Sequence, residues 1–358
     1  MPFSILYGWG TALRNWAYDK GWKKSKDYDI PILCVGNIAA GGTGKTPFVA
    51  YLLEKLIAKG YRVAVVSRGY KRKSKGLQIA SEESSAAQLG DEPYLLYRRY
   101  PQAIIAVDAN RQRAIDFLSV LPREERPHVI IMDDGYQHRS VTPHLSILLT
   151  RYDCPYYEDR LLPLGGLRES PKSRLRAKIV IVTKCPPCIS PMDMRIMDRN
   201  LDLFAHQKIY YMSADVLPPR SVFSLPANAP SLTLSSPTVL CAGIASPQHF
   251  FEGAKKHFTR VAEECAWADH HFFDDEEIDK INDWAEDHFI ITTEKDAVRL
   301  IDMKESLSEE ARSKIYYLPL KIAFLRHEED TFLANITEEI SSKIKNQPLT
   351  NNSFSSKK

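Results

Sequence analysis

The sequence of 358 residues contains no apolar run close to the roughly 18–20 residues that cross a bilayer as a helix. Its N-terminus also lacks the basic segment, apolar block and small-residue cleavage site of a secretory signal. The formal net charge is only +3, which is too small to indicate a nucleic-acid partner by itself. We therefore expect a chain that neither spans a membrane nor carries a secretory signal, and its length favours two domains over one.

Cysteine is also sparse, and its positions do not have the spacing of a disulfide scaffold, which fits a reducing cytosol. Cys185 and Cys188 form a C-x-x-C pair, but no second pair follows to complete a zinc site. We interpret the pair as small residues where a strand leads into a loop.

The chain does contain a glycine-rich loop between an apolar strand at 32–35 and an amphipathic helix at 48–58. A loop of this kind that ends in Gly-Lys-Thr cradles nucleotide phosphates, because backbone N–H groups and the helix N-terminus face them. Lys45 would reach the β- and γ-phosphates, and the Thr46 hydroxyl would bind Mg²⁺. Ala39 stands where the consensus has its first glycine, so the alternative is a structural turn with an exposed lysine. The predicted ATP-binding residues are Ala39, Ala40, Gly41, Gly42, Thr43, Gly44, Lys45 and Thr46.

A second apolar strand, at 128–132, ends in Asp133 and Asp134. A carboxylate at a strand tip beside a phosphate loop can hold Mg²⁺ directly or through water. Adjacent residues of a strand point to opposite sides, so we expect one of the two aspartates to face the metal. The alternative is an Asp-Gly turn without a metal.

Residues 1–26 have the pattern of one amphipathic helix, in which Leu6, Trp9, Leu13 and Trp16 fall on a single face. Aromatic and aliphatic side chains beside lysine and arginine are typical of a helix that lies in a membrane interface. The alternative is a terminal helix whose apolar face packs on the protein's own core.

Short apolar runs alternate with helical patterns from about residue 30 to 212, which predicts a parallel sheet with helices on both faces. A proline- and serine-rich stretch follows, and then a second α/β pattern. The fold class that we predict is α/β: a P-loop NTPase-like parallel-sheet domain, a second, smaller α/β domain and an N-terminal amphipathic helix. The predicted divisions are the helix at 1–26, the P-loop domain at 27–212, a linker at 213–237, the C-terminal α/β domain at 238–345 and a disordered tail at 346–358.

Basic segments at 67–73, 107–113 and 165–169 should meet at one sheet edge if the sheet is doubly wound, where they would suit an anionic substrate. Charged segments are more often solvated surface. Thr293 with Asp296 has the form of a helix capping box. Asp91 and Glu92 stand at the start of a predicted helix, where acidic side chains are stabilised by the helix dipole.

In combination, these segments resemble the tetraacyldisaccharide 4′-kinase family of lipid A biosynthesis. The resemblance runs from the N-terminal helix to about residue 320, and its most specific part is the segment 133–138, Asp-Asp-Gly-Tyr-Gln-His. The other matching segments are 35–37 with 41–47, 67–70, 90–93, 166–169, 269–270 and 293–297. The missing first glycine of the phosphate loop is also usual in this family.

The resemblance implies transfer of the γ-phosphate of ATP to the 4′-hydroxyl of a tetraacylated glucosamine disaccharide 1-phosphate, with ATP and Mg²⁺ bound between two α/β domains. Asp91 matches the family's general base, His270 the residue that tunes it from the second domain, and Lys45 the lysine of the phosphate loop. The implied metal ligands are Thr46, Asp133, Asp134 and Glu92. The residues implied to line the site or bind substrate are Arg68, Arg111, His138, Arg168 and Glu169.

The implied partners are the lipid disaccharide in the membrane interface and an anionic phospholipid surface, at the cytoplasmic face of the bacterial inner membrane. No nucleic-acid partner or obligate protein partner is indicated. The main alternative is a membrane-associated P-loop switch ATPase, but such proteins place a second lysine before the two glycines, where this chain has Ala40. A P-loop kinase of a soluble metabolite would leave the N-terminal helix unexplained.

Overall fold

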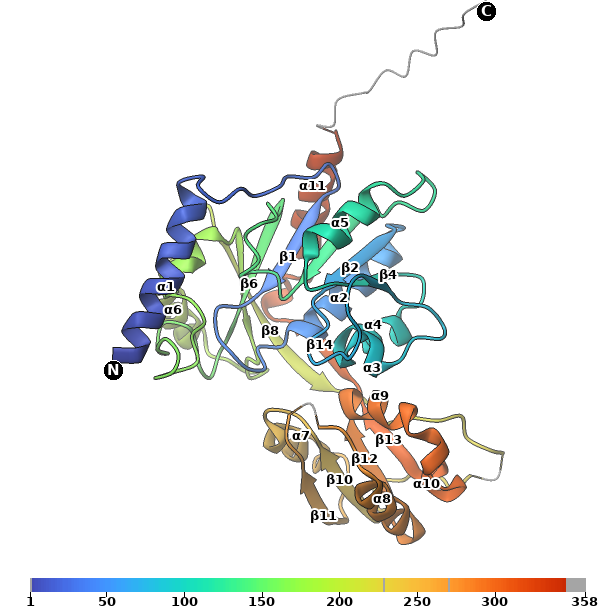
Figure 1. Cartoon of the computed structure of the whole chain (residues 1–358). Coiled ribbons are helices and arrows are strands. Elements are labelled where there is room, and N and C mark those ends of the chain that lie inside the picture. The colour runs from blue at the N-terminus through green and yellow to red at the C-terminus, as the bar shows by residue number, and fades with distance from the viewer. Residues whose placement is uncertain (1, 228, 270, 346–358) are drawn as a thin grey trace, which may run out of the picture.

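The computed structural model describes residues 2–227, 229–269 and 271–345. The chain forms two units, each built on one β-sheet, and the predicted α/β fold class is confirmed (Figure 1). We call the elements around the larger sheet the large unit and residues 220–318 the small unit. His270 and the predicted tail at 346–358 lie outside the described residues.

The large sheet has the strand order β14-β8-β7-β6-β1-β5-β2-β4-β3. All neighbours pair in parallel except the two edge strands, β14 and β3, which are antiparallel to theirs. Its strands are β1 (Ile32–Gly36), β2 (Val63–Ser67), β3 (Gln78–Ile79), β4 (Ile104–Val107), β5 (Val129–Asp133), β6 (Leu145–Arg151), β7 (Ile179–Thr183), β8 (Lys208–Val216) and β14 (Leu320–Phe324).

Helices cover both faces of this sheet, because side chains of successive strand residues point to opposite sides. Leu33 and Val35 pack with α2 (Lys45–Ala58), α3 (Ala86–Leu89), α4 (Asp91–Arg99) and α11 (Glu329–Lys345). Ile32 and Cys34 pack with α5 (Arg111–Ser119) and α6 (Pro191–Leu201). The central strands are buried on both sides, as their continuous apolar sequence predicts.

The small sheet has the order β11-β10-β12-β13-β9, in which only β9 is antiparallel to its neighbour. The strands are β9 (Arg220–Ser221), β10 (Thr238–Ala242), β11 (Val261–Ala266), β12 (Phe289–Thr293) and β13 (Ile315–Leu318). The helices α8 (Asp275–Asp287) and α10 (Glu309–Lys314) pack on one face, and α7 (Pro247–Ala254) packs on the other.

After the small unit, the chain returns to the large one. The backbone N–H of Leu217 donates to the carbonyl of Pro319 (2.8 Å), so the outgoing and returning segments lie side by side. β14 then pairs with β8, and Phe332 of α11 is fully buried against Phe48, Tyr210 and Phe324. The sequence predicts residues 238–345 as one C-terminal domain, but β14 and α11 belong to the large core, since an amphipathic pattern does not tell which sheet a helix covers. The predicted linker likewise contains the end of β8 and all of β9.

The Phe332→Ala change tests the contribution of α11 to the large core. Loss of a fully buried ring and the resulting cavity should lower the free energy of unfolding by about 3–5 kcal/mol, measured by urea denaturation. The matched change Phe204→Ala removes a ring that is 56% exposed and should cost less than about 0.5 kcal/mol. Equal effects of the two changes would show that α11 is not part of the cooperative core.

Candidate active site

The glycine-rich loop joins β1 to α2 and is held by contacts with neighbouring strand ends. Gly44 has a φ of 77° immediately before Lys45, the first residue of α2. Asn37 Nδ2 donates to Thr43 Oγ1 (2.7 Å), and Thr183 Oγ1 donates to the carbonyl of Thr43 (3.0 Å). Gly44 provides no side-chain cap, so the N–H groups of the first helical turn are directed toward the cavity described below.

Ala39 occupies the consensus glycine position without strain. It is not among the residues with positive φ, and it forms an isolated β-bridge with Leu167. Beside it, the N–H of Ala40 donates to the carbonyl of Gly166 (2.6 Å). The loop therefore does not need a glycine at this point, because its backbone is held in bridge pairing.

A cavity of about 1350 Å³ lies over the loop, between the large unit, the small unit and α1 (Pro2–Asp19). The predicted site residues that line it are Gly41, Gly42, Thr43, Gly44, Lys45, Thr46, Arg68, Glu92, Arg111, Asp133, Asp134, Arg168 and Glu169. Ala39, Ala40, Asp91 and His138 are not among the lining residues.

Both aspartates of the β5 tip line this cavity, and which of them would face a metal stays a prediction. Asp133 is the last residue of β5 and is buried. Asp134 lies beyond the strand in a left-handed turn (φ 45°), so the alternation of strand side chains no longer applies to it. Its carboxylate is 3.6 Å from Lys45 Nζ and accepts a hydrogen bond from Arg168 Nη1 (3.1 Å).

The Asp133 carboxyl group is the candidate metal ligand with an unsatisfied atom. Its Oδ2 accepts from Ser67 Oγ (3.3 Å), whereas the buried Oδ1 has no partner among the described residues. Burial, reinforced by the neighbouring Glu92 and Asp134, raises the pKa of Asp133 to about 7. The described residues contain no cluster of three His, Cys, Asp or Glu side chains that could hold a metal by themselves. The donor set instead fits Mg²⁺, which takes few protein carboxylates and completes its shell with water and phosphate oxygens.

Two guanidinium groups form a positive part of the cavity wall. Arg111 is buried, its Nε has no partner among the described residues, and its pKa is lowered by burial and by the nearby Arg68. An anion between these arginines would satisfy the orphaned N–H and relieve the repulsion.

His138 lies behind the cavity surface, and Glu169 lines the cavity from a buried position. Burial lowers the pKa of His138 to about 4, with Arg111, Arg14 and Arg68 adding to the effect, and its Nε2 lies 2.9 Å from Ser140 Oγ. Glu169 is buried, pairs with Arg176 and accepts a hydrogen bond from Asn15 Nδ2 (3.3 Å), which attaches α1 to the large unit.

The acidic pair at the start of α4 contacts the small unit. Asp91 is buried and pairs with Arg299 (2.7 Å), and Glu92 pairs with Lys295 (2.5 Å). Both cations belong to α9 (Glu294–Asp302). Close backbone approach positions this turn: Gly90 has a φ of 92°, and a Cβ added there would lie 3.1 Å from the carbonyl oxygen of Tyr70.

Sequence reasoning missed Lys295, Arg299 and Lys184, each for lack of a specific signal. The first two lie in the segment that we interpret as a capping box, and Thr293 Oγ1 does accept from Asp296 N (3.2 Å). Lys184 follows the tip of β7 in a left-handed conformation (φ 57°) and lines the cavity, and burial lowers its pKa. A lysine directly after an apolar strand was the only available signal for it.

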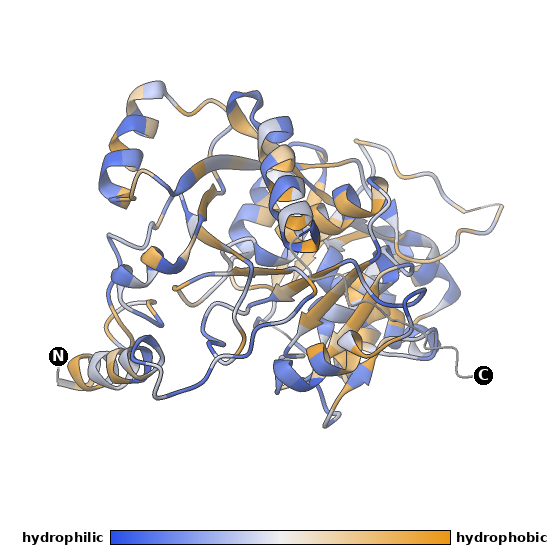
Figure 2. Cartoon of the chain, turned by 90° about the horizontal axis from the view of Figure 1, so that it is seen from above, coloured by the Kyte–Doolittle hydropathy of each residue, from blue (hydrophilic) through white to orange (hydrophobic). Residues whose placement is uncertain are grey.

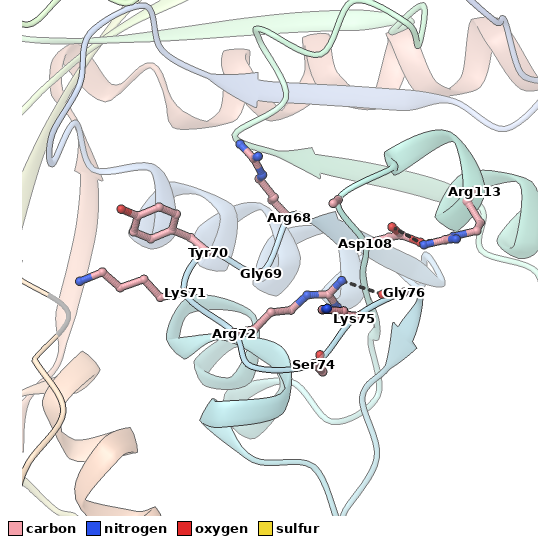
Figure 3. A pocket seen from close by; sticks show the side chains of 11 residues that line it. Arg68, Gly69, Tyr70, Lys71, Arg72, Ser74, Lys75, Gly76, Asp108 and Arg113 are labelled. Atoms are coloured by element: carbon pink, nitrogen blue, oxygen red, sulfur yellow. Dashed lines mark hydrogen bonds and ion pairs between the residues drawn. The ribbon is translucent and has the colours of Figure 1, made fainter.

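A smaller cavity of about 460 Å³ lies beside the loop after β2 (Figure 3). Some of its side chains have partners within the protein: Arg72 donates to the carbonyls of Val107 (2.9 Å) and Gly76 (2.6 Å), and Arg113 of α5 pairs with Asp108, which follows β4. Arg68, Tyr70 and Lys71 line both cavities.

The helix α1 has one side on the main cavity and one side in solvent. Tyr7, Thr11, Arg14 and Asn15 line the cavity. The apolar face is exposed, with Leu6 63%, Trp9 72% and Leu13 65% accessible, so it does not pack on the protein's own core. Figure 2 shows α1 at the edge of the molecule, apart from the sheets. No helix among the described residues has both the length and the apolar character needed to cross a bilayer.

The buried Asp133 predicts a pH-dependent stability for the ligand-free protein. Its pKa is raised from 3.8 to about 7 on folding, so between these pH values the folded state binds more protons and stability falls as pH rises. Asp133→Asn removes this cost and should raise the unfolding free energy at pH 8 by roughly 1–3 kcal/mol, with little gain at pH 4. The measurement is denaturation in chelator at both pH values. Asp134→Asn, which breaks ion pairs, should give no gain; an Asp133→Asn protein that is no more stable than wild type at pH 8 would refute the prediction.

Known proteins resemble this chain over nearly its whole length. The family model for tetraacyldisaccharide-1-P 4′-kinase (LpxK) matches residues 1–341. The tetraacyldisaccharide 4′-kinase of Porphyromonas gingivalis is 44% identical over 352 residues, with 96% of this chain and 97% of that protein covered. The corresponding enzyme of Parabacteroides distasonis is 43% identical, with 97% and 96% covered.

A solved structure also matches nearly the whole chain. It is the crystal structure of LpxK from Aquifex aeolicus in complex with ATP, which superimposes with a TM-score of 0.71 at 29% identity and covers 95% of this chain and 98% of that one. The full-length family match and the close relatives lead to one conclusion: this chain belongs to the tetraacyldisaccharide 4′-kinase family.

Proposed function

We propose that this kinase transfers the γ-phosphate of ATP to the 4′-hydroxyl of tetraacyldisaccharide 1-phosphate, which gives the bisphosphorylated lipid A precursor. Membership of the family supports ATP as donor and the lipid disaccharide as acceptor. One observation carries the proposal: a single cavity has the phosphate loop on one wall and a helix with an exposed apolar face on another. A water-soluble acceptor would not require that arrangement.

The loop residues Gly41 to Thr46 would hold the ATP phosphates through backbone N–H groups, and Lys45 would supply a positive charge. In the ligand-free chain Lys45 faces Asp134, and it would exchange that partner for the phosphate. Arg168, which also contacts Asp134, is placed to contribute charge on the same side.

Mg²⁺ would be held by Asp133 and the Thr46 hydroxyl, with Asp134 beside them. The unpartnered Oδ1 and the raised pKa of Asp133 fit a group that a cation completes. Bound there, Mg²⁺ would neutralise developing charge on the phosphate oxygens. Glu92, the fourth residue predicted from the resemblance, is paired with Lys295 and would have to leave that partner to act as a ligand.

Asp91 would accept the proton of the sugar hydroxyl, with His270 as its helper from the small unit. Phosphoryl transfer needs little covalent chemistry from the protein, so correct placement of this base matters more than its strength. Arg68 and Arg111 would contact the anionic acceptor, because both line the cavity, the buried Nε of Arg111 has no hydrogen-bond partner among the described residues, and the two guanidinium groups repel each other.

The exposed apolar face of α1 would lie in the membrane interface, which places the kinase at the cytoplasmic face of the inner membrane. Lys20, Lys23 and Lys24 follow this helix and would meet anionic phospholipid headgroups. The cavity would then open beside the lipid surface from which the acceptor comes. The alternative of a P-loop switch ATPase offers no role for a cavity wall made by this helix.

Lys45→Ala tests the phosphate loop. Transfer from labelled Mg-ATP to the lipid acceptor in detergent micelles should fall roughly 10²–10³-fold, because the change removes a preorganised charge at the transferring group. Circular dichroism should show the fold intact. The control Lys59→Ala alters an exposed lysine at the far end of α2 and should leave transfer unchanged; near-normal turnover of Lys45→Ala would contradict the assignment.

Trp9→Glu with Leu13→Glu tests the membrane face of α1. Sedimentation with vesicles that contain phosphatidylglycerol should drop at least tenfold, because two exposed apolar anchors are lost. The control Val120→Glu changes a 78% exposed apolar residue at the end of α5 and should bind as wild type does. Undiminished sedimentation of the double variant would place the membrane contact elsewhere.

A further inference from the structure

The contact between the two units is organised by one helix, α9, which lies against α3 and α4 (Figure 1). Polar contacts join it to the large unit along its length. They are Glu294 with Arg99 (3.5 Å), Lys295 with Glu92 (2.5 Å), Arg299 with Asp91 (2.7 Å) and Asp302 with the N–H of Ala86 (3.0 Å). These contacts fix the position of α9 along α4. They include Asp91 and Glu92 at the start of α4, and Glu92 lines the main cavity.

Arg299 differs from the other members of this set because it is buried, as is its partner. The side chains of Arg299 and Asp91 are 4% and 6% exposed. Both Nε (3.1 Å) and Nη2 (2.7 Å) donate to Oδ2 of Asp91. The remaining nitrogen, Nη1, donates to Asp296 Oδ1 (2.6 Å) and to the carbonyl of Gly243 (3.3 Å). A guanidinium bonded on both sides in this way cannot turn without breaking several charged hydrogen bonds.

Asp296 extends the network to the backbone of Gly243 in the small unit. Its Oδ2 accepts from Gly243 N (2.9 Å) and from Thr293 Oγ1 (2.6 Å). Gly243 in turn approaches His271, since a Cβ added to the glycine would lie 3.4 Å from the His271 Cβ. Arg299 thus lies between Asp91 of the large unit and the backbone of Gly243, which approaches His271 in the small unit.

We propose that Arg299 is the positioning residue for Asp91: it orients the carboxylate from the small unit. The inference rests on the proposed role of Asp91 as general base. Because both bonds from Arg299 go to Oδ2, the orientation of Oδ1 is set at the same time. A base with a fixed orientation needs no reorganisation when the acceptor hydroxyl arrives.

Asp302, at the end of α9, also joins the two units, through the N–H of Ala86 (3.0 Å). A change at Asp302 therefore weakens the contact between the units without removing the Arg299 bonds to Asp91.

The test compares kcat and the KM for ATP in Arg299→Gln, Arg299→Lys and Asp302→Asn. Arg299→Gln should lower kcat roughly 10- to 100-fold and change the KM for ATP less than about threefold. Arg299→Lys keeps the charge but loses the planar fork, so its kcat should remain reduced. Asp302→Asn weakens the contact between the units but leaves the bonds to Asp91 in place, so its kcat should stay within about threefold of wild type.

Several outcomes would overturn the inference. A wild-type kcat in folded Arg299→Gln, or an equal loss of kcat in Asp302→Asn, would show that Arg299 only joins the two units. If that variant does not fold, because Asp91 and Asp296 lose their cation, Arg299→Lys decides: a wild-type kcat would refute positioning. Asp91→Asn separates the two hypotheses, since full activity in that variant refutes the base itself. Loss of activity there, with wild-type behaviour of the Arg299 variants, refutes only the positioning.

Discussion

Parallel pairing of β1 with β5 and β6 is the constraint on which the rest of the site depends. In this register Val35 is opposite Asp133, so the strand that leads into the phosphate loop and the strand that ends in the carboxylates finish at the same level. Parallel strands also need a crossover between them, and α2 begins at that same edge. The loop, the helix N-terminus and the carboxylates therefore meet in one cavity because of how the backbone pairs, before any side chain is considered.

The parts of the site that depend on local sequence were predictable. A strand, a glycine-rich turn and Gly-Lys-Thr specify the loop by themselves, and the apolar run before Asp133 specifies the second strand. Strand alternation does not extend to Asp134, because the strand ends at Asp133 and the turn that follows returns the second carboxylate to the same cavity. The prediction that the last helix belongs to the C-terminal domain was wrong, because Phe332 of α11 packs on α2 and β8, which are distant from it in sequence.

The contacts of α9 show where sequence reasoning ends. Thr293 and Asp296 are explained locally as a helix cap, and that explanation is correct as far as it goes. The same Asp296 also holds Arg299, whose other partner is Asp91, some two hundred positions earlier in the chain. A residue pattern that has a complete local explanation gives no reason to look for a distant partner, so a structural role can conceal a functional one.

The adjacency of Leu217 and Pro319 has an evolutionary consequence. The small unit leaves and re-enters the large one at neighbouring points, and β14 and α11 complete the host core only afterwards. Neighbouring ends are the condition under which a segment can be inserted into a folded domain without disturbing it. The small unit could therefore change in its own loops without disturbing the core of the large unit, as long as the face of α9 that meets α4 is kept.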